Sequence, residues 1–159
     1  MTLETNGANV RPKVYISGPL TSSGNVLENV EVAIVAARRL IEAGFSPMVP
    51  HLSYHIDPVE MYPHETWMEV DLPWLEAADA VLRLPGESVG ADIEARHAQY
   101  HRIPVFDSMA DLVEHFAGQA GSETANVAAV AVAEASPILS GGLAGLETRP
   151  GRQEAAQGP

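Results

Sequence analysis

The sequence contains no cysteine and only one lysine, Lys13, among its 159 residues. Without cysteine the chain has neither a disulfide framework nor a thiolate zinc site, which is the usual condition of a protein in the reducing cytoplasm. No apolar run approaches the roughly 20 residues of a membrane-spanning helix, and the N-terminus lacks the apolar core of a secretion signal. We therefore predict a cytoplasmic protein with no membrane partner.

Positive charge is scarce throughout the chain. Nine lysine and arginine residues stand against 21 aspartate and glutamate residues, and the formal net charge is -12 at pH 7. This excess of negative charge repels the phosphate backbone of nucleic acids and anionic membrane surfaces, so we predict no nucleic-acid partner. Any phosphate group that the protein binds must be held locally, by backbone N–H groups and hydroxyls.

Hydrophobic residues make up 46% of the chain, which is enough for a globular core in a single domain. We predict a flexible leader over 1–12 and a folded domain over 13–117. From 118 to 159 the sequence is poor in aromatic residues and rich in alanine, glycine, serine, glutamine and proline. This composition is typical of a low-complexity tail, and we predict that it is disordered.

Segments typical of strands and helices alternate within the domain. Strands are predicted at 13–17, 45–50, 78–84 and 103–106, and helices at 26–43, 66–78, 90–101 and 109–116. Prolines place the second strand at a sheet edge, Pro73 predicts a break in the second helix, and 51–65 is predicted to be a long loop. The apolar face of the first helix comprises Val26, Val30, Ala33, Ile34, Ala37, Leu40 and Ile41. The alternation predicts an α/β fold, with a mainly parallel sheet of four or five strands between two helical layers.

An apolar run, a loop of small residues and a helix follow one another between Ala80 and Ala98. Gly86 and Gly90 relieve the backbone in the loop, and the free N–H groups at the start of the helix attract an anion. Asp92 and Glu94 lie early in this helix, where the helix dipole alone favours acidic side chains. Because the carboxyl ends of parallel strands meet at one edge of a sheet, we expect this loop and the SGPLTSSG loop to face the same crevice.

Five short segments, taken in order, resemble the nucleoside 2-deoxyribosyltransferase-like superfamily, and within it the small DUF4406-type proteins. They are Val14–Pro19, His51–Ser53, Asp71–Leu75, Asp79–Val81 and Leu84–Glu94. The resemblance covers the sequence from Lys13 to Phe106. It implies a flavodoxin-like, Rossmann-like three-layer sandwich that assembles as a homodimer or a higher homo-oligomer.

The resemblance also implies cleavage of an N-glycosidic bond. In that superfamily a glutamate near a helix start attacks the anomeric carbon of a nucleoside or nucleotide, and Glu94 occupies this position. Tyr15 matches a tyrosine that holds the glutamate, and Asp71 matches an aspartate that helps to deliver a proton to the leaving base. These residue types suit the reaction, which needs a carboxylate beneath the anomeric carbon and a proton donor near the base.

The residue six positions before the nucleophile is Ser88, which resembles the phosphate-binding serine of nucleotide N-hydrolases; deoxyribosyltransferases tend to have an aspartate there. We therefore predict a nucleoside 5′-monophosphate as substrate. The candidate substrate-binding residues are Ser17, Gly18, Pro19, Ser88, Gly90, Asp92 and, for the base, His51. The first loop lacks the arginine common in nucleotide hydrolases, so a free nucleoside stays open as substrate. Two further alternatives also stay open: base exchange by a deoxyribosyltransferase, which would use the same Glu94 intermediate, and a catalytically silent nucleotide-binding protein on the same fold.

Two pairs of histidines, His51 with His55 and His97 with His101, are spaced four residues apart, as in some helical metal sites. Neither pair belongs to an HExxH motif, and the sequence offers no evident third ligand for either. We therefore predict that His97 and His101 lie on a solvated helix face, and we expect neither a metal nor a cofactor.

Overall fold

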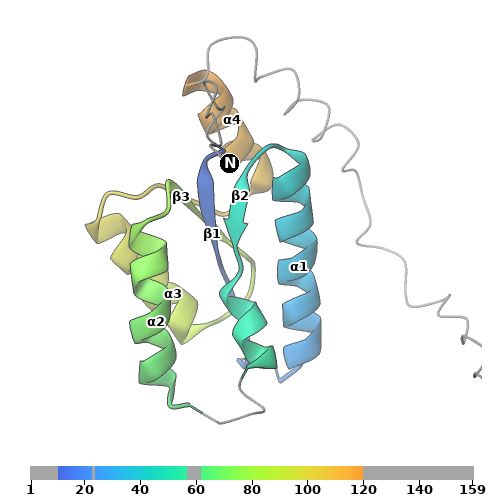
Figure 1. Ribbon diagram of the computed structural model, residues 1–159, viewed down its shortest axis with the longest axis vertical. Coiled ribbons are helices and arrows are strands. Elements are labelled where there is room, and N and C mark those ends of the chain that lie inside the picture. Colours follow the sequence, from blue (N-terminus) through green and yellow to red (C-terminus); the bar gives the residue numbers. More distant parts are fainter. Residues whose placement is uncertain (1–10, 23, 57–61, 120–159) are drawn as a thin grey trace, which may run out of the picture.

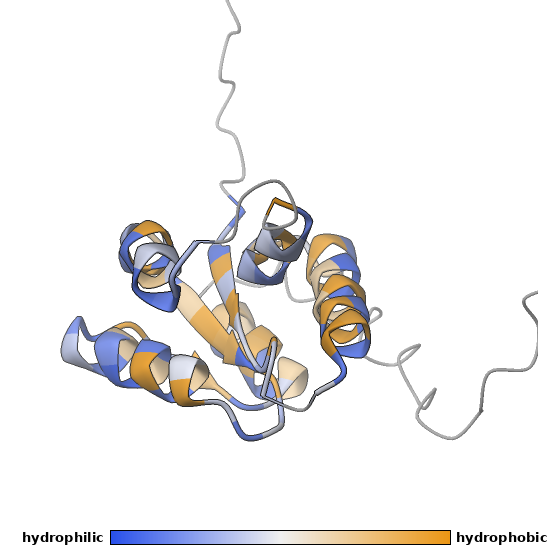
Figure 2. Cartoon of the chain, turned by 90° about the horizontal axis from the view of Figure 1, so that it is seen from below, coloured by the Kyte–Doolittle hydropathy of each residue, from blue (hydrophilic) through white to orange (hydrophobic). Residues whose placement is uncertain are grey.

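The computed structural model describes residues 11–22, 24–56 and 62–119 (Figure 1). Its four strands form one parallel sheet in the order β2-β1-β3-β4. The strands are β1 (Lys13–Ser17), β2 (Ser46–Met48), β3 (Ala80–Arg83) and β4 (Val105–Phe106). Helices flank the sheet on both faces (Figure 2), and this order is that of flavodoxin-like and Rossmann-like folds. The predicted fold class and the edge position of β2 are confirmed. The predicted leader, apart from residues 11–12, and the predicted tail after 119 lie outside the described residues.

The observed helices differ from the predicted ones in several places. They are α1 (Val26–Glu42), α2 (His64–Glu76), α3 (Val89–Tyr100) and α4 (Met109–Gln119), together with a short 3₁₀ helix, η1 (Pro50–His55). The helix η1 occupies part of the predicted loop, and α4 continues three residues past its predicted end. The helix α2 passes through Pro73 without a break. A proline removes one backbone hydrogen bond, and the burial of Leu75 against Tyr15 compensates for that loss.

The two faces of the sheet have separate hydrophobic cores, because alternate residues of a strand point to opposite sides. Val14 and Ile16 of β1 pack with α1 and α4, whereas Tyr15 faces α2 and α3. Leu75 of α2 and Ala98 of α3 cover Tyr15 and are themselves fully buried. Tyr15 and Ser17 therefore point toward the same two helices.

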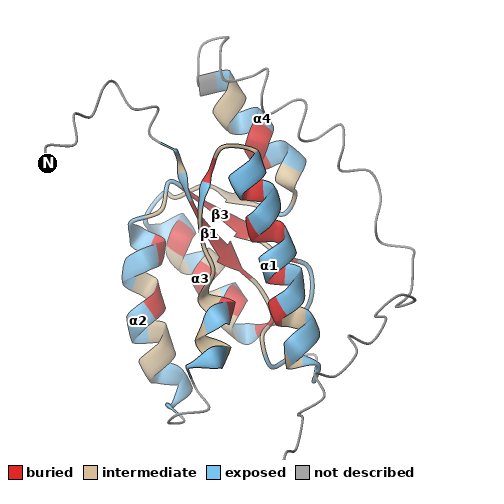
Figure 3. Ribbon diagram, turned by 45° about the vertical axis from the view of Figure 1, so that its right-hand side comes forward, coloured by how far each residue is buried: buried red, intermediate tan, exposed pale blue. Residues whose placement is uncertain are grey.

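The helix α1 buries a narrower stripe than the sequence predicts. Of the seven predicted residues, those facing the sheet are buried, namely Val30, Ala33, Ala37 and Leu40, and Val26 is half-buried. Ile34 and Ile41 are 37% and 47% exposed, contrary to the prediction. Each follows a buried residue by one position, and one position turns a helix by about 100°, away from the sheet. Figure 3 shows the buried inner side and the exposed outer side of α1. No described helix, α1 included, is both long and apolar enough to cross a membrane.

Candidate active site

A cleft of about 530 Å³ lies beyond the carboxyl ends of β1 and β3. In the strand order β2-β1-β3-β4, β2 lies on one side of β1 and β3 on the other, so the position beyond β1 and β3 is the topological switch point where open α/β sheets bind ligands. The volume falls in the range of small-molecule sites. The polar and aromatic part of its wall comprises Thr21, Ser22, His51, Ser53, Tyr54, Tyr62, His64, Trp67, Asp71, Ser88 and Glu94.

Glu94 lies at the wall of this cleft, and both of its carboxylate oxygens accept hydrogen bonds from side chains of the sheet. The Tyr15 hydroxyl donates a hydrogen bond to Oε1 of Glu94 at 2.7 Å, and the Ser17 hydroxyl donates one to Oε2 at 2.6 Å. The two donors are two residues apart on β1, so the pleat of the strand directs both at α3. Glu94 itself is only 8% exposed. The predicted contact between Tyr15 and Glu94 is present, and Ser17 proves to be a partner of Glu94 and not a part of the cleft wall.

The surroundings of Glu94 act on its pKa in both directions. Burial raises the pKa, while the hydrogen bonds from Ser17 and Tyr15 lower it, as do the nearby charges of Arg83 and His64. The net result is a pKa above the ordinary value. Burial, and then the negative charges of Glu94 and Asp71, raise the pKa of the Tyr15 hydroxyl. Tyr15 therefore keeps its proton near neutral pH and acts toward Glu94 only as a donor.

Asp71 is the second buried carboxyl group of the site. It belongs to α2, lines the same cleft and is also 8% exposed. Burial, and then the negative charge of Glu94, raise the pKa of Asp71 from 3.8 to about 6. Because the negative charge of Glu94 contributes to this shift, Asp71 keeps its proton to a higher pH than an ordinary aspartate does.

His51 stands out because its imidazole is 3% exposed and neither ring nitrogen makes a hydrogen bond of good geometry to the described residues. Burial lowers the pKa of His51, and the nearby backbone of Pro19 and Gly18 opposes this effect only in part. A neutral imidazole has one donor and one acceptor nitrogen. Buried polar groups are nearly always paired, and the nearby partners of these two nitrogens are the backbone groups of Gly18 and Pro19.

The start of α3 forms the polar end of the cleft. Ser88 caps the helix by accepting a hydrogen bond from the Ala91 N–H at 3.2 Å, and its hydroxyl proton stays available to a ligand. The N–H groups of Val89 and Gly90 lie in the first turn, where the helix itself offers them no acceptor. His64 approaches from α2, with its Cε1 atom 3.4 Å from the place that a side chain on Gly90 would take. His64 was not predicted as a site residue. It directly follows Pro63, and because proline is common at helix starts, this position could have indicated that α2 begins here.

Two predicted substrate-binding residues lie elsewhere. The Asp92 side chain is 64% exposed and pairs with the Arg83 guanidinium at 3.1 Å, outside the cleft wall. It precedes Glu94 by two positions, which turns it about 200° around the helix, so the two side chains cannot face the same way. Pro19 also lies outside the cleft wall and is buried against Gly86. Gly18, Ser88, Gly90 and His51 line the cleft, and their binding of a substrate stays a prediction.

The loop between β3 and α3 depends on Gly86. Its φ of +116° is unfavourable for other residues, and a Cβ atom there would lie 2.8 Å from Cγ of Pro19. We expect Gly86→Ala to lower the free energy of unfolding by about 2–3 kcal/mol, from backbone strain and a collision. Gly44→Ala is the control, because Gly44 has a φ of +90° but nothing within 4 Å of its Cβ position. Urea unfolding should show the larger loss for Gly86→Ala; equal losses would contradict a constraint from Pro19.

Among the described residues, the only group of three potential metal ligands is Glu76, His97 and His101, outside the cleft wall. The fold and the two buried carboxyl groups thus define an α/β protein with an acidic cleft at the switch point of its sheet. The chain belongs to the family described as domain of unknown function DUF7768, whose model matches residues 12–107. This segment includes all four strands and every residue of the carboxyl pair and its hydrogen-bond partners. No curated protein is similar enough to the chain to count as a match.

Proposed function

We propose that this protein hydrolyses the N-glycosidic bond of a nucleoside 5′-monophosphate. The observation that carries the proposal is the Glu94 carboxylate, held by Tyr15 and Ser17 at the wall of a nucleotide-sized cleft that also contains Asp71. A fixed carboxylate near a second carboxyl group of raised pKa is the arrangement that retaining glycoside cleavage requires. The resemblance of the site segments to nucleoside 2-deoxyribosyltransferase-like proteins supports the same reaction.

The reaction proceeds in two displacements. An oxygen of Glu94 bonds to the anomeric carbon while the carbon–nitrogen bond breaks, and its electron pair leaves with the base. Asp71, in its protonated form, gives a proton to the departing nitrogen. Asp71 then accepts a proton from water, whose oxygen attacks the anomeric carbon and releases the sugar phosphate together with a free Glu94 carboxylate. Tyr15 and Ser17 orient the carboxylate throughout.

The groups at the start of α3 favour a substrate that carries a phosphate group. The Ser88 hydroxyl, the N–H groups of Val89 and Gly90 and the His64 imidazole converge there without any lysine. A helix N-terminus attracts an anion through its free N–H groups and its dipole. His51 lines the same cleft, and we assign its imidazole to contact with the base.

The direct test is incubation of the purified protein with a panel of ribonucleosides, deoxyribonucleosides and their 5′-monophosphates, with base release followed by chromatography. We expect release from monophosphates and little or none from nucleosides. Each reaction is repeated with a second free base. Incorporation of that base into new nucleoside or nucleotide would assign the protein to the transferases, since both classes pass through the same glycosyl-enzyme. Tight binding of monophosphates without any release would instead leave a nucleotide-binding protein.

A further inference from the structure

A histidine-carboxylate cluster lies on the outside of the α2–α3 pair, away from the cleft wall. Oε1 of Glu76, the last residue of α2, is 2.8 Å from Nε2 of His97 and 3.7 Å from Nε2 of His101. The two imidazole rings have centroids 4.5 Å apart and are tilted by 35°. All three ligand atoms lie within 4.8 Å of one another.

The backbone fixes this convergence. His97 lies in the last turn of α3 and His101 is its C-cap, so the four-residue spacing places both rings on one side of the helix end. Arg102 follows with a φ of 61°, a left-handed conformation that is uncommon for residues other than glycine. The N–H of Arg102 then bonds to the Gln99 carbonyl at 3.0 Å, and the N–H of Ile103 to the Ala98 carbonyl at 2.8 Å. These bonds close the end of α3 directly after His101.

Two imidazoles and one carboxylate are a ligand set for borderline transition metals, and Zn²⁺ is bound in this way in sites that leave a fourth position to water. Metal–ligand distances of about 2.0–2.2 Å around a tetrahedral ion require ligand atoms about 3.3–3.6 Å apart. The present separations bracket that range, so a small shift that replaces the Glu76–His97 hydrogen bond by metal bonds is enough. The side chains are 25% to 45% exposed, which leaves an ion and its water ligand a path from solvent.

We propose that Glu76, His97 and His101 form a binding site for a divalent transition-metal ion of the Zn²⁺ type, which links the C-terminal ends of α2 and α3. The sequence suggested only the histidine pair; the fold adds the third ligand from another helix. The linked helices are the ones that carry Asp71 and Glu94, five residues before Glu76 and three residues before His97. A bound ion therefore stiffens the support of the carboxyl pair without touching the cleft. This proposal does not depend on the reaction proposed above.

The test uses the full chain without an affinity tag, freed of metal by a chelator. Isothermal titration is expected to show one Zn²⁺ per chain, with a dissociation constant in the micromolar range or tighter. Saturating Zn²⁺ is expected to raise the melting temperature by at least about 5 °C, since a ligand that binds only the folded state stabilises it. Mg²⁺ at the same concentration is expected to cause no such shift, because it prefers oxygen ligands.

Variants locate the site. His97→Ala, His101→Ala and Glu76→Gln should each weaken Zn²⁺ binding at least tenfold, and the double variant of both histidines should abolish the thermal shift. His55→Ala is the matched control, because His55 is an exposed histidine on η1, outside the cluster. If an alanine variant does not fold, glutamine at the same position retains a polar side chain of similar size. Undiminished Zn²⁺ binding in the double variant, or no binding by the wild type at micromolar concentrations, would overturn the proposal.

Discussion

Replacing Glu94 by glutamine is expected to reduce base release by a factor on the order of 10³ or more. The amide is a poor nucleophile, so the first displacement fails even though the side chain keeps its size. The fold should tolerate the change, because the hydroxyls of Tyr15 and Ser17 can accept as well as donate hydrogen bonds. Single-turnover measurement of base release with the purified variant, at saturating monophosphate, is the appropriate assay. Wild-type turnover by Glu94→Gln would rule out Glu94 as the nucleophile.

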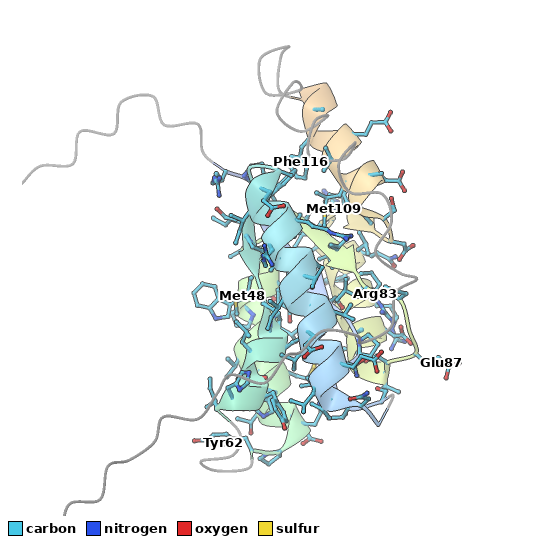
Figure 4. All side chains as sticks on the ribbon, turned by 90° about the vertical axis from the view of Figure 1, so that its right-hand side faces the viewer. Met48, Tyr62, Arg83, Glu87, Met109 and Phe116 are labelled. Carbon is cyan, nitrogen blue, oxygen red and sulfur yellow. The ribbon has the colours of Figure 1, made fainter. Side chains whose placement is uncertain are left out.

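The matched control is Glu87→Gln, in the loop that leads into α3. Glu87 is exposed and projects away from the ribbon (Figure 4), so its loss should leave base release within about twofold of the wild type. Stability separates the two variants as well. The pKa of Glu94 is raised in the folded state, so its ionisation costs stability as the pH rises through that pKa. A glutamine does not titrate, and Glu94→Gln should therefore be at least as stable as the wild type near neutral pH.

The sequence predicted the sheet because the order of strands and helices depends on local rules, whereas the pairing of Tyr15 with Glu94 was implied by the resemblance to nucleoside 2-deoxyribosyltransferase-like proteins. The apolar residues of β1 and β3 are continuous, as in strands buried on both faces, and the alternation of strands with helices leaves a parallel order as the natural solution. Tyr15 and Ser17 are two residues apart on β1, so their side chains lie on the same face of the sheet, which is the face that α2 and α3 cover. The position of Glu94 within the helix after β3 follows from the same alternation.

The errors arose where tertiary contacts override local preference. Pro73 disfavours a helix, yet the burial of Leu75 next to it against Tyr15 keeps α2 intact. The predicted role of Asp92 overlooked that residues two apart on a helix face different directions. His64 enters the site only because α2 starts two residues earlier than predicted and lies beside α3. None of these contacts between helices is encoded in a spacing that a single sequence reveals.

Replacing Asp71 by asparagine is expected to lower base release by about 10²- to 10⁴-fold, since the variant cannot protonate the leaving base. The pH dependence carries the sharper prediction. The pKa of Asp71 is about 6, so the proton donor is progressively lost above that pH. We expect kcat/KM of the wild type to fall about tenfold per unit of pH above about 6, and to fall on the acidic side as Glu94 becomes protonated. Asp71→Asn should lose the alkaline limb of this profile. A limb that persists in the variant would assign the proton to another group.

The pH dependence of the free energy of unfolding is an independent test of the raised pKa of Asp71. Because the folded state raises the pKa of Asp71 from 3.8 to about 6, the wild type is relatively more stable below about pH 4 and loses that contribution as the pH rises through about 6. The full pKa shift corresponds to about 3 kcal/mol in the free energy of unfolding. Because Asp71 lines the cleft, solvent there screens the carboxyl group and reduces this contribution to about 1 kcal/mol. Asp71→Asn should therefore melt several degrees higher than the wild type at about pH 8, and this difference should vanish at about pH 4.

The leaving group distinguishes a proton donor from a residue that merely shapes the cleft. A substrate whose aglycone departs as a stable anion, such as a nitrophenyl glycoside of the sugar phosphate, needs no proton in the first displacement. Asp71→Asn should therefore form the glycosyl-enzyme from this substrate at a rate within about tenfold of the wild type, while its loss with a natural base remains large. Glu69→Gln, an exposed carboxyl group two positions earlier on α2, should affect neither substrate. Equal losses by Asp71→Asn with both substrates would make Asp71 a positioning residue. The proton donor would then have to be sought among the other groups of the cleft, such as His64 beside Gly90.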